Sequence, residues 1–417
     1  MIQANNLEAL WYNFDTTKVI SPDSPMYVKR IENCLRKLAF DLRMNQDYFH
    51  GFLCGHIGSG KTTELLRLKE DAKLNEKYLP IYLSISELHV DRVHLTHDAL
   101  MVEMANAILE QTDESQLNRD FAKRVEKWGL RVTNTMIDNQ KVLNEIGAKP
   151  SLWLAYFKSQ LASRVEWNQQ QKQTHEPKVL DLIEIVNQMA TDFHNKTKKH
   201  LLVMVDDLEK GESDADKKMH HRIFNEQYNT LIQPQMNIIY TMPVYFRGLT
   251  TKRVEDGRIY SFSSIRLFDF ESKSQTRPTL AKDSEGYALI SDIVKHRVAD
   301  VDKLFARGQL DELIRIGGGL LRETARGIRE ATYHAITRES AQIEKEDVDY
   351  VFNKIKKDFQ PQIRGKTIDL LKAAAQCDTG WIEGIEPYLQ SGAVVEYENG
   401  NIWLDVRYPL KSYVLNL

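Results

Sequence analysis

Apolar residues follow two patterns along this chain, and together they predict helices alternating with buried strands. Five apolar residues at helical spacing predict a helix over 26–45, namely Val28, Ile31, Leu35, Leu38 and Leu42. Short continuous apolar runs predict strands at 50–54, 78–86, 200–207, 235–246 and 261–270. Continuous runs are typical of a parallel sheet that helices cover on both faces, so we expect an α/β fold.

Changes in this pattern divide the chain into four parts. We interpret 1–25 as an N-terminal extension and 26–280 as the sheet core, in which the polar-amphipathic stretch at about 95–197 is a helical insertion. Residues 281–358 return to helices, interrupted by three glycines at 317–319. In 359–417, two helices precede two alternating strands around an Asn-Gly pair, which is a hairpin signal. This order predicts a winged-helix domain, with Tyr397 and Trp403 in its core.

Composition excludes several classes of protein. Of the 417 residues, 42% are hydrophobic and 28% are charged, as in soluble globular proteins. A formal net charge of -3 provides no global basic field for nucleic acid, so such a contact would have to be local. The three cysteines follow no disulfide or zinc pattern, and no apolar run approaches the roughly 18 residues of a membrane span. We expect a cytoplasmic protein.

The glycine-rich stretch after the first predicted strand carries the strongest chemical signal. Residues 55–62, GHIGSGKT, fit GxxxxGK[ST] at every position and precede a predicted helix over 62–74. In such loops, backbone N–H groups and a helix N-terminus bind phosphates. The pattern arises by chance in only about one or two chains per hundred of this length. We predict polyphosphate binding by Gly55, His56, Ile57, Gly58, Ser59, Gly60, Lys61, Thr62 and Thr63.

A second apolar run, LLVMVDDLE at 201–209, ends in carboxylates. The carboxyl ends of parallel strands form the edge where α/β sheets bind ligands. We therefore predict that Asp206 and the Thr62 hydroxyl hold Mg²⁺. Asp207 or Glu209 would polarise the attacking water, and the sequence leaves the choice between them open. A strand that ends in solvated acids explains the run equally well by itself, but the glycine-rich loop favours the metal.

Five segments in this order resemble bacterial ATPases of the AAA+ superfamily, near the origin-recognition and STAND branches. They are GHIGSGKTTELLRL, LLVMVDDLEK, NIIYTMPVYF, GGGLLRETARGIREA and the winged-helix tail. The resemblance covers most of the chain and is weakest across 110–180. It implies ATP as the nucleotide, Thr241 as a γ-phosphate sensor where asparagine is commoner, and Arg322 as a lid arginine on the nucleotide. It also implies that Arg253 or Arg258 acts on a neighbouring subunit, although a solvated loop explains both arginines equally well.

The fold expected is thus a P-loop NTPase core with a helical insertion, a helical lid and a winged helix. The function expected is that of a magnesium-dependent ATPase that acts as a nucleotide-driven switch for a protein partner or a homo-oligomer. The resemblance adds phage defence as a context. A nucleotide-gated scaffold with little turnover and a DNA remodeller or loader remain alternatives. The second helix of the predicted winged helix carries Glu383 and Glu386 and no basic residue, which favours a protein partner over DNA.

A group of histidines in the insertion attracts no chemical interpretation. His89, His94 and His97 are loosely spaced for metal ligands, and we expect them to face solvent or to cap a helix.

Overall fold

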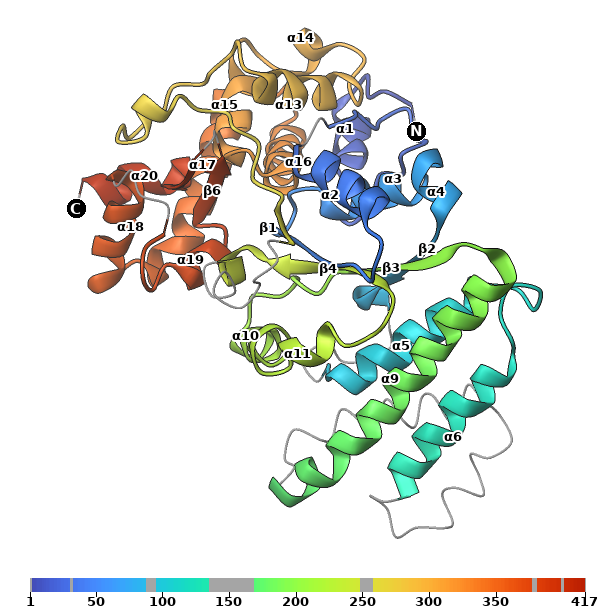
Figure 1. Cartoon of the computed structure of the whole chain (residues 1–417). Helices are drawn as coiled ribbons and strands as arrows, with labels where there is room; N and C mark the ends of the chain where they lie inside the picture. The colour runs from blue at the N-terminus through green and yellow to red at the C-terminus, as the bar shows by residue number, and fades with distance from the viewer. Residues whose placement is uncertain are drawn as a thin grey trace.

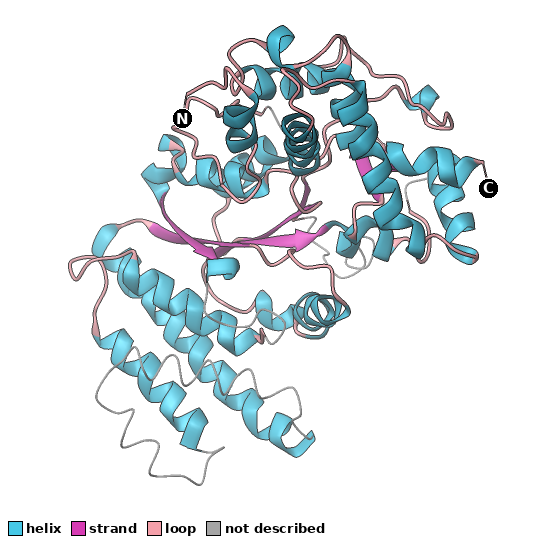
Figure 2. Ribbon diagram, turned by 180° about the vertical axis from the view of Figure 1, so that it is seen from behind, coloured by secondary structure: helices cyan, strands magenta, loops and turns pink. Residues whose placement is uncertain are grey.

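The computed structural model describes residues 2–30, 33–87, 95–134, 169–247, 258–376, 381–398 and 401–416. Its centre is a five-stranded parallel sheet with the order β2-β3-β4-β1-β5 (Figures 1 and 2). The strands are β1 (His50–Gly55), β2 (Tyr78–Ser84), β3 (His200–Asp206), β4 (Asn237–Pro243) and β5 (Ile259–Ser261). The predicted α/β fold with a parallel sheet is confirmed.

Helices cover both faces of the sheet, and this explains why its strands are continuously apolar. Alternate residues of β3 enter different cores: Leu202 and Met204 pack on one side, Val203 and Val205 on the other. The first side is covered by α2 (Asn33–Met44), α3 (Lys61–Lys69) and α4 (Ala72–Lys77). The second side is covered by α5 (His97–Glu110), α9 (Gln169–Thr197), α10 (Asp214–His221) and α11 (Tyr228–Leu231).

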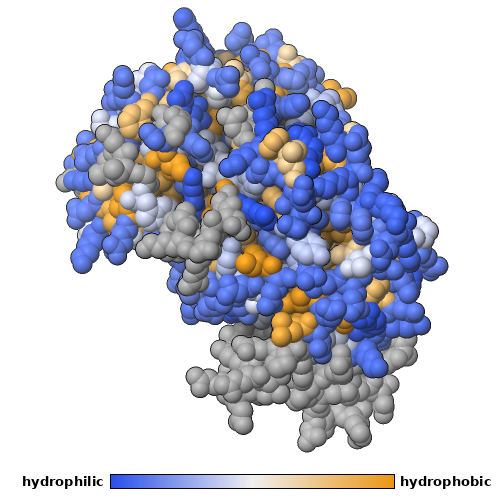
Figure 3. Space-filling view, viewed as in Figure 1, coloured by the Kyte–Doolittle hydropathy of each residue, from blue (hydrophilic) through white to orange (hydrophobic). Residues whose placement is uncertain are grey.

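Part of the second helical layer extends away from the sheet. There α6 (Asp120–Asn134) lies beside α9, and both project beyond the strands (Figure 1). The surface seen in Figure 3 is mainly hydrophilic, with apolar residues in small scattered groups. In the described part of the chain, no helix is long and apolar enough to cross a membrane.

A second helical body follows the sheet. It contains α13 (Glu285–Lys295), α14 (Val301–Leu304), α15 (Gln309–Gly317), α16 (Leu321–Thr337) and α17 (Lys345–Phe359). The N-terminal helix α1 (Leu7–Asn13) buries Leu7 and Leu10 in the same apolar core as Ile328 and Ala331 of α16. The helical body that we expected over 281–358 therefore also includes a helix from the start of the chain. We call α13–α17 the lid.

The last described segment contains three helices and one hairpin. They are α18 (Lys366–Gln376), α19 (Glu386–Gln390), the antiparallel pair β6 (Val394–Glu398) and β7 (Ile402–Val406), and α20 (Tyr408–Leu415). Tyr397 and Trp403 are buried and stack on each other, as expected for core residues. The Asn-Gly pair expected in the turn lies outside the described residues. We call α18–α20 the C-terminal unit.

Three predicted elements differ from the structure. The strand predicted at 261–270 was wrong beyond Ser261, because the backbone N–H groups of Ser264 and Ile265 bond to Glu396 and Gly319 instead of to the sheet. The helix predicted over 62–74 is broken between α3 and α4, where the Asp71 side chain accepts a hydrogen bond from the Leu74 N–H and starts a new helix. The first predicted helix begins at Asn33, and residues 26–30 before it are not helical.

A buried ion pair in the C-terminal unit provides a test of its packing. Lys411 and Asp405 are both almost fully buried, and their charged atoms lie 2.7 Å apart. We expect Lys411→Met to reduce the free energy of unfolding by about 3–5 kcal/mol, because it leaves a buried carboxylate without its cation. Urea unfolding measures this loss, and Lys357→Met, at an exposed lysine of α17, is the control.

The loss should depend on pH. Burial raises the pKa of Asp405 to about 7, and without Lys411 the pKa rises further. Above the ordinary pKa of 3.8 the unfolded chain has released this proton while the folded chain retains it. Stability of the variant should therefore fall as pH rises, and the loss should be larger at pH 8 than at pH 5. An equal loss at both values would contradict this account.

Candidate functional site

The glycine-rich loop joins the end of β1 to the start of α3, as predicted. Gly58 has a φ of 78° and Gly60 a φ of 105°, a left-handed conformation that glycine adopts most readily. A Cβ atom on Gly58 would also lie 2.4 Å from the Cβ of Arg322 in the lid. Glycine at position 58 thus permits both the turn of the loop and the close approach of α16.

Lys61, the first residue of α3, is buried inside this loop. Its Nζ donates to the carbonyl oxygens of Gly55 at 2.9 Å and His56 at 2.7 Å. The same Nζ lies 2.9 Å from Oε1 of Glu209, whose side chain is only 4% exposed. An ammonium has three donors, so these three partners satisfy it. An anionic ligand that binds Lys61 must therefore replace at least one of them.

Asp206 ends β3 next to the loop and is fully buried. It accepts hydrogen bonds from the Tyr82 hydroxyl at 2.7 Å and the Asp207 N–H at 2.8 Å, and it bonds to the side chain of Thr62. Burial, followed by the charges of Glu209 and Asp207, raises the pKa of Asp206 to about 6. The local balance of charge is therefore negative, and a cation beside Asp206 would relieve it.

The oxygens at this point suit a magnesium ion. Thr62 and Asp206 are in contact, and the buried Oε2 of Glu209 has no hydrogen-bond partner among the described residues. Carboxylate and hydroxyl oxygens are ligands that Mg²⁺ accepts, together with water and phosphate oxygens. Within the described ranges, no group of three His, Cys, Asp or Glu side chains forms a metal site by itself. An ion here would need phosphate oxygens or water to complete its shell.

The two candidate bases have different partners. Asp207 has a φ of 70°, accepts from the Ser84 hydroxyl at 2.8 Å and pairs with Lys210 at 2.7 Å. Burial alone would raise the pKa of Asp207, but the bonds from Lys210 and Ser84 and the charge of Lys210 lower it overall. Glu209 is held by Lys61 instead. Each of the two carboxylates is thus paired with a lysine.

The remaining predicted residues that the structure describes lie in three different places. Thr241 is buried in β4, where its Oγ1 accepts a hydrogen bond from the Leu208 N–H at 3.2 Å. It thus helps to hold residues 206–209, which we call the acidic turn. Arg322 lies at the start of α16, and its backbone N–H donates to the Gly58 carbonyl at 3.1 Å. Arg258 lies near the amino end of β1, donating to the Tyr48 carbonyl at 3.0 Å. It is thus at the sheet edge opposite the loop.

Some of the predicted residues lie outside the described residues, and the prediction for His97 was wrong. Arg253 lies outside the described residues, as do His89 and His94. His97 neither faces solvent nor caps a helix, because it is the first residue of α5 and is buried. Its backbone N–H donates to the Gln227 side chain at 3.2 Å, which places the start of α5 beside the residues that precede α11.

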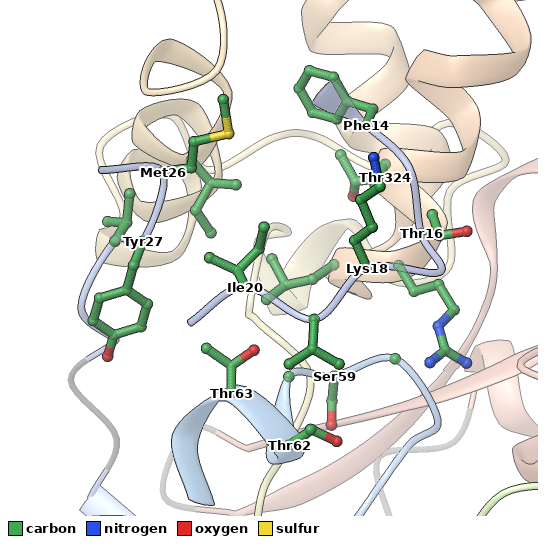
Figure 4. A pocket seen from close by; sticks show the side chains of 18 of the residues that line it. Phe14, Thr16, Lys18, Ile20, Met26, Tyr27, Ser59, Thr62, Thr63 and Thr324 are labelled. Carbon is green, nitrogen blue, oxygen red and sulfur yellow. The ribbon is translucent and has the colours of Figure 1, made fainter. Parts of the chain in front are cut away.

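A cavity of about 240 Å³ lies beside the loop (Figure 4). Its walls are the loop and first turn of α3 (58–64), Glu209 and Lys210 after β3, two lid segments (289–297 and 321–325) and the N-terminal segment (13–30). Ser59, Thr62 and Thr63 lie at one side, whereas Ile20 and Met26 face the cavity from the N-terminal segment. The loop end is polar, and the other walls mix apolar side chains with polar ones, which suits an elongated ligand with an anionic and a largely apolar part.

Sequence reasoning missed the wall that 13–30 provides. This segment contacts the loop and the lid across long stretches of chain, and no motif or periodic pattern marks it. The hydroxyl of Ser84, which bonds to Asp207, was also missed. Its position at the carboxyl end of the second predicted strand was the available signal.

The loop also contacts the C-terminal unit. The Nε2 atom of His56 accepts a hydrogen bond from the Glu396 N–H of β6 at 2.9 Å, and the Glu396 carboxylate pairs with Arg247 at 3.0 Å. The Gln390 side chain donates to the carbonyl of Gly211, shortly after the acidic turn, at 2.8 Å. Burial, and then the charge of Lys61, lowers the pKa of His56 to about 3. A neutral histidine thus joins the loop to β6.

Comparison with known proteins finds similarity among solved structures alone. The Aeropyrum pernix ORC1 protein in complex with DNA has a TM-score of 0.41 at 12% identity, over 97% of this chain and 96% of that one. Drosophila ORC bound to DNA has 0.42 at 13%, over 100% and 96%, and Aeropyrum pernix ORC2 with ADPNP and ADP has 0.37 at 10%, over 97% and 97%. No protein-family model and no curated protein matches the sequence. Similarity at this level carries no inference about the site.

The buried histidine predicts a pH dependence of stability. Between the ordinary pKa of 6.5 and the folded value of about 3, the unfolded chain binds a proton at His56 that the folded chain does not. The folded state therefore loses stability as pH falls through this range. His56→Gln removes this effect. Between pH 7.5 and pH 5 the free energy of unfolding should therefore fall by about 2 kcal/mol less in the variant than in the parent.

Denaturant unfolding at several pH values measures the difference. His296→Gln, at an exposed histidine that follows α13, is the matched control. If His56→Gln and the parent lose stability in parallel, the buried neutral histidine is not the cause.

Proposed function

We propose that this chain is a magnesium-dependent ATPase of the AAA+ superfamily, near its origin-recognition and STAND branches. The observation that carries the proposal is that a buried ammonium, Lys61, and the Thr62 hydroxyl line one end of a cavity, where Thr62 bonds to Asp206. Apolar side chains such as Ile20, Leu289 and Ile290 line other parts of the same cavity. A triphosphate fits the polar end and a base the apolar walls.

Each polar residue would have a separate task. Lys61 turns from Glu209 and the loop carbonyls to the outer phosphates, while the N–H groups of the loop and of α3 bind them. Thr62 and Asp206 hold Mg²⁺, which neutralises charge on the phosphates when bound. Asp207 or Glu209 orients the attacking water, and Glu209 becomes available once Lys61 has turned. Thr241 supports the acidic turn from β4.

Contacts around the loop support a switch between nucleotide states. Arg322 joins the loop to the lid, and His56 joins it to the C-terminal unit, which we propose is a winged helix. A change in the loop on hydrolysis would therefore reach both bodies. Arg258 lies away from its own loop, which is compatible with action on a neighbouring subunit. We propose a homo-oligomer or a protein partner as the recipient, and phage defence as the context.

DNA remodelling is the second candidate. Three exposed cations, Lys357, Arg364 and Lys366, lie close together in sequence where α17 meets α18, and they favour a local contact with phosphates. ATP turnover with and without DNA separates the candidates. Stimulation by DNA supports a remodeller, and negligible turnover with retained nucleotide supports a scaffold.

The proposal is tested first at Lys61. Lys61→Ala should weaken Mg-ATP binding at least about 100-fold in calorimetry, because it removes the buried cation that meets the phosphates. Lys73→Ala, at an exposed lysine of α4, is the control. Since this variant leaves Glu209 buried and unpaired, Lys61→Met combined with Glu209→Gln should be measured as well. Parental affinity in both variants would refute nucleotide binding at this loop.

Glu209 competes with phosphate for Lys61. We expect Glu209→Gln to bind nucleotide about tenfold more tightly, because a phosphate then displaces no ion pair and meets one carboxylate fewer. Glu212→Gln, at an exposed position three residues further on, provides the comparison. Turnover of Glu209→Gln and Asp207→Asn then distinguishes the base. Unchanged or weaker binding in Glu209→Gln would contradict the competition.

A further inference from the structure

The N-terminal segment 2–30 contacts both bodies that enclose the cavity, and we call it the clasp. Its first part packs on the lid. Ala4 forms a parallel bridge with Val298, in which the Ala4 N–H donates to the Arg297 carbonyl at 2.8 Å and the Ala299 N–H donates to the Ala4 carbonyl at 2.9 Å. Helix α1 then packs on α16.

One arginine of the lid holds the clasp at the point where it leaves α1. The guanidinium of Arg329 in α16 lies 2.9 Å from the Asp15 carboxylate. The same guanidinium lies 3.9 Å from the centroid of the Trp11 ring. An ion pair and a cation–π contact on one side chain give this point a defined geometry. After Asp15 the chain departs towards the sheet core.

The other end of the clasp is held by the glycine-rich loop. Arg30 is only 5% exposed and donates to the carbonyl oxygens of Ser59 at 2.8 Å and Ser263 at 2.7 Å. Its guanidinium also lies 4.3 Å from the centroid of the Phe262 ring. Nearby, the Tyr27 hydroxyl donates to the Glu64 carboxylate of α3 at 3.1 Å. This end therefore follows any movement of the loop.

Between the two ends the clasp crosses the cavity. The hydrogen bonds found for 16–26 join residues of the clasp itself, such as Thr17 to Asp15 and Met26 to Ser24. Ile20 and Met26 turn their side chains into the cavity (Figure 4). Val19 also lines the cavity and is 56% exposed. The crossing is thus held at its ends and by its apolar contacts with whatever fills the cavity.

We propose that the clasp closes over the bound nucleotide and limits the rate at which it leaves. This inference rests on the proposed function. Because one end is attached to the lid and the other to the loop, the two bodies cannot separate fully until an attachment opens. A contact that must break before the ligand departs acts on the dissociation rate more than on the association rate. Nucleotide in the cavity should in turn stabilise the clasp, since the coupling is reciprocal.

The test is the release of fluorescent mant-ADP from the full chain, chased with excess ADP in a stopped-flow instrument. Arg329→Met removes both contacts of the lid anchor and should release mant-ADP about tenfold faster. Asp15→Asn removes only the ion pair and should give a smaller increase, about threefold. Arg326→Met, an exposed arginine of the same helix that pairs with Glu323, is the matched control and should release at the parental rate.

Amide hydrogen exchange supplies a second readout. In the parent, ADP should slow exchange in residues 14–26, and in Arg329→Met this protection should be largely lost. Parental release from Arg329→Met and Asp15→Asn would overturn the clasp, as would equal acceleration in Arg326→Met, which would indicate general loosening of the lid. If the parent itself fails to bind mant-ADP, the proposed function is wrong and the clasp falls with it.

Discussion

The burial of one ammonium group determines how the site is built. Lys61 is held by two carbonyl oxygens at the start of the loop and by Glu209 beyond β3. A buried cation is tolerated only where such partners satisfy it. β1 and β3 both pair in parallel with β4, so their carboxyl ends lie at the same edge of the sheet and the residues that follow them can meet. The position of Glu209 thus follows from the topology of the sheet.

The same edge also fixes how the other bodies attach. At Gly58 the lid comes so close that any side chain would collide with Arg322, and at His56 the N–H of β6 reaches the ring nitrogen. Arg30 brings the clasp to Ser59 of the same loop. Three residues of a short loop, His56, Gly58 and Ser59, therefore contact three different parts of the chain. A shift of the loop cannot be absorbed locally, because its neighbours are packed backbone and buried polar groups.

The features that could be predicted from the sequence are those whose cause is local. The apolar runs identified β1 to β4, and the spacing of Gly55, Gly60 and Lys61 identified the loop, because strand burial and phosphate binding each impose a pattern on neighbouring residues. The fifth strand was overextended because Ile265, Leu267 and Phe268 are apolar for another reason. They pack against residues of the lid and of β6 and β7, while the backbone N–H groups of Ser264 and Ile265 bond to Glu396 and Gly319. The wall formed by 13–30 and the anchors at Arg30 and Arg329 join distant residues, and no local pattern records such contacts.

The charges at this edge of the sheet bear on the proposed binding of a metal and a nucleotide. Among the described residues at this edge, Lys61 and Lys210 face three carboxylates, those of Asp206, Asp207 and Glu209. Asp206 bears the excess of negative charge, and its pKa rises to about 6. A triphosphate alone would add negative charge and would draw Lys61 from Glu209, which would leave a second carboxylate uncompensated. A magnesium ion alone would lack the phosphate oxygens that complete its shell. Each ligand thus corrects the imbalance that the other creates, and the Thr62–Asp206 contact is the point at which both corrections meet.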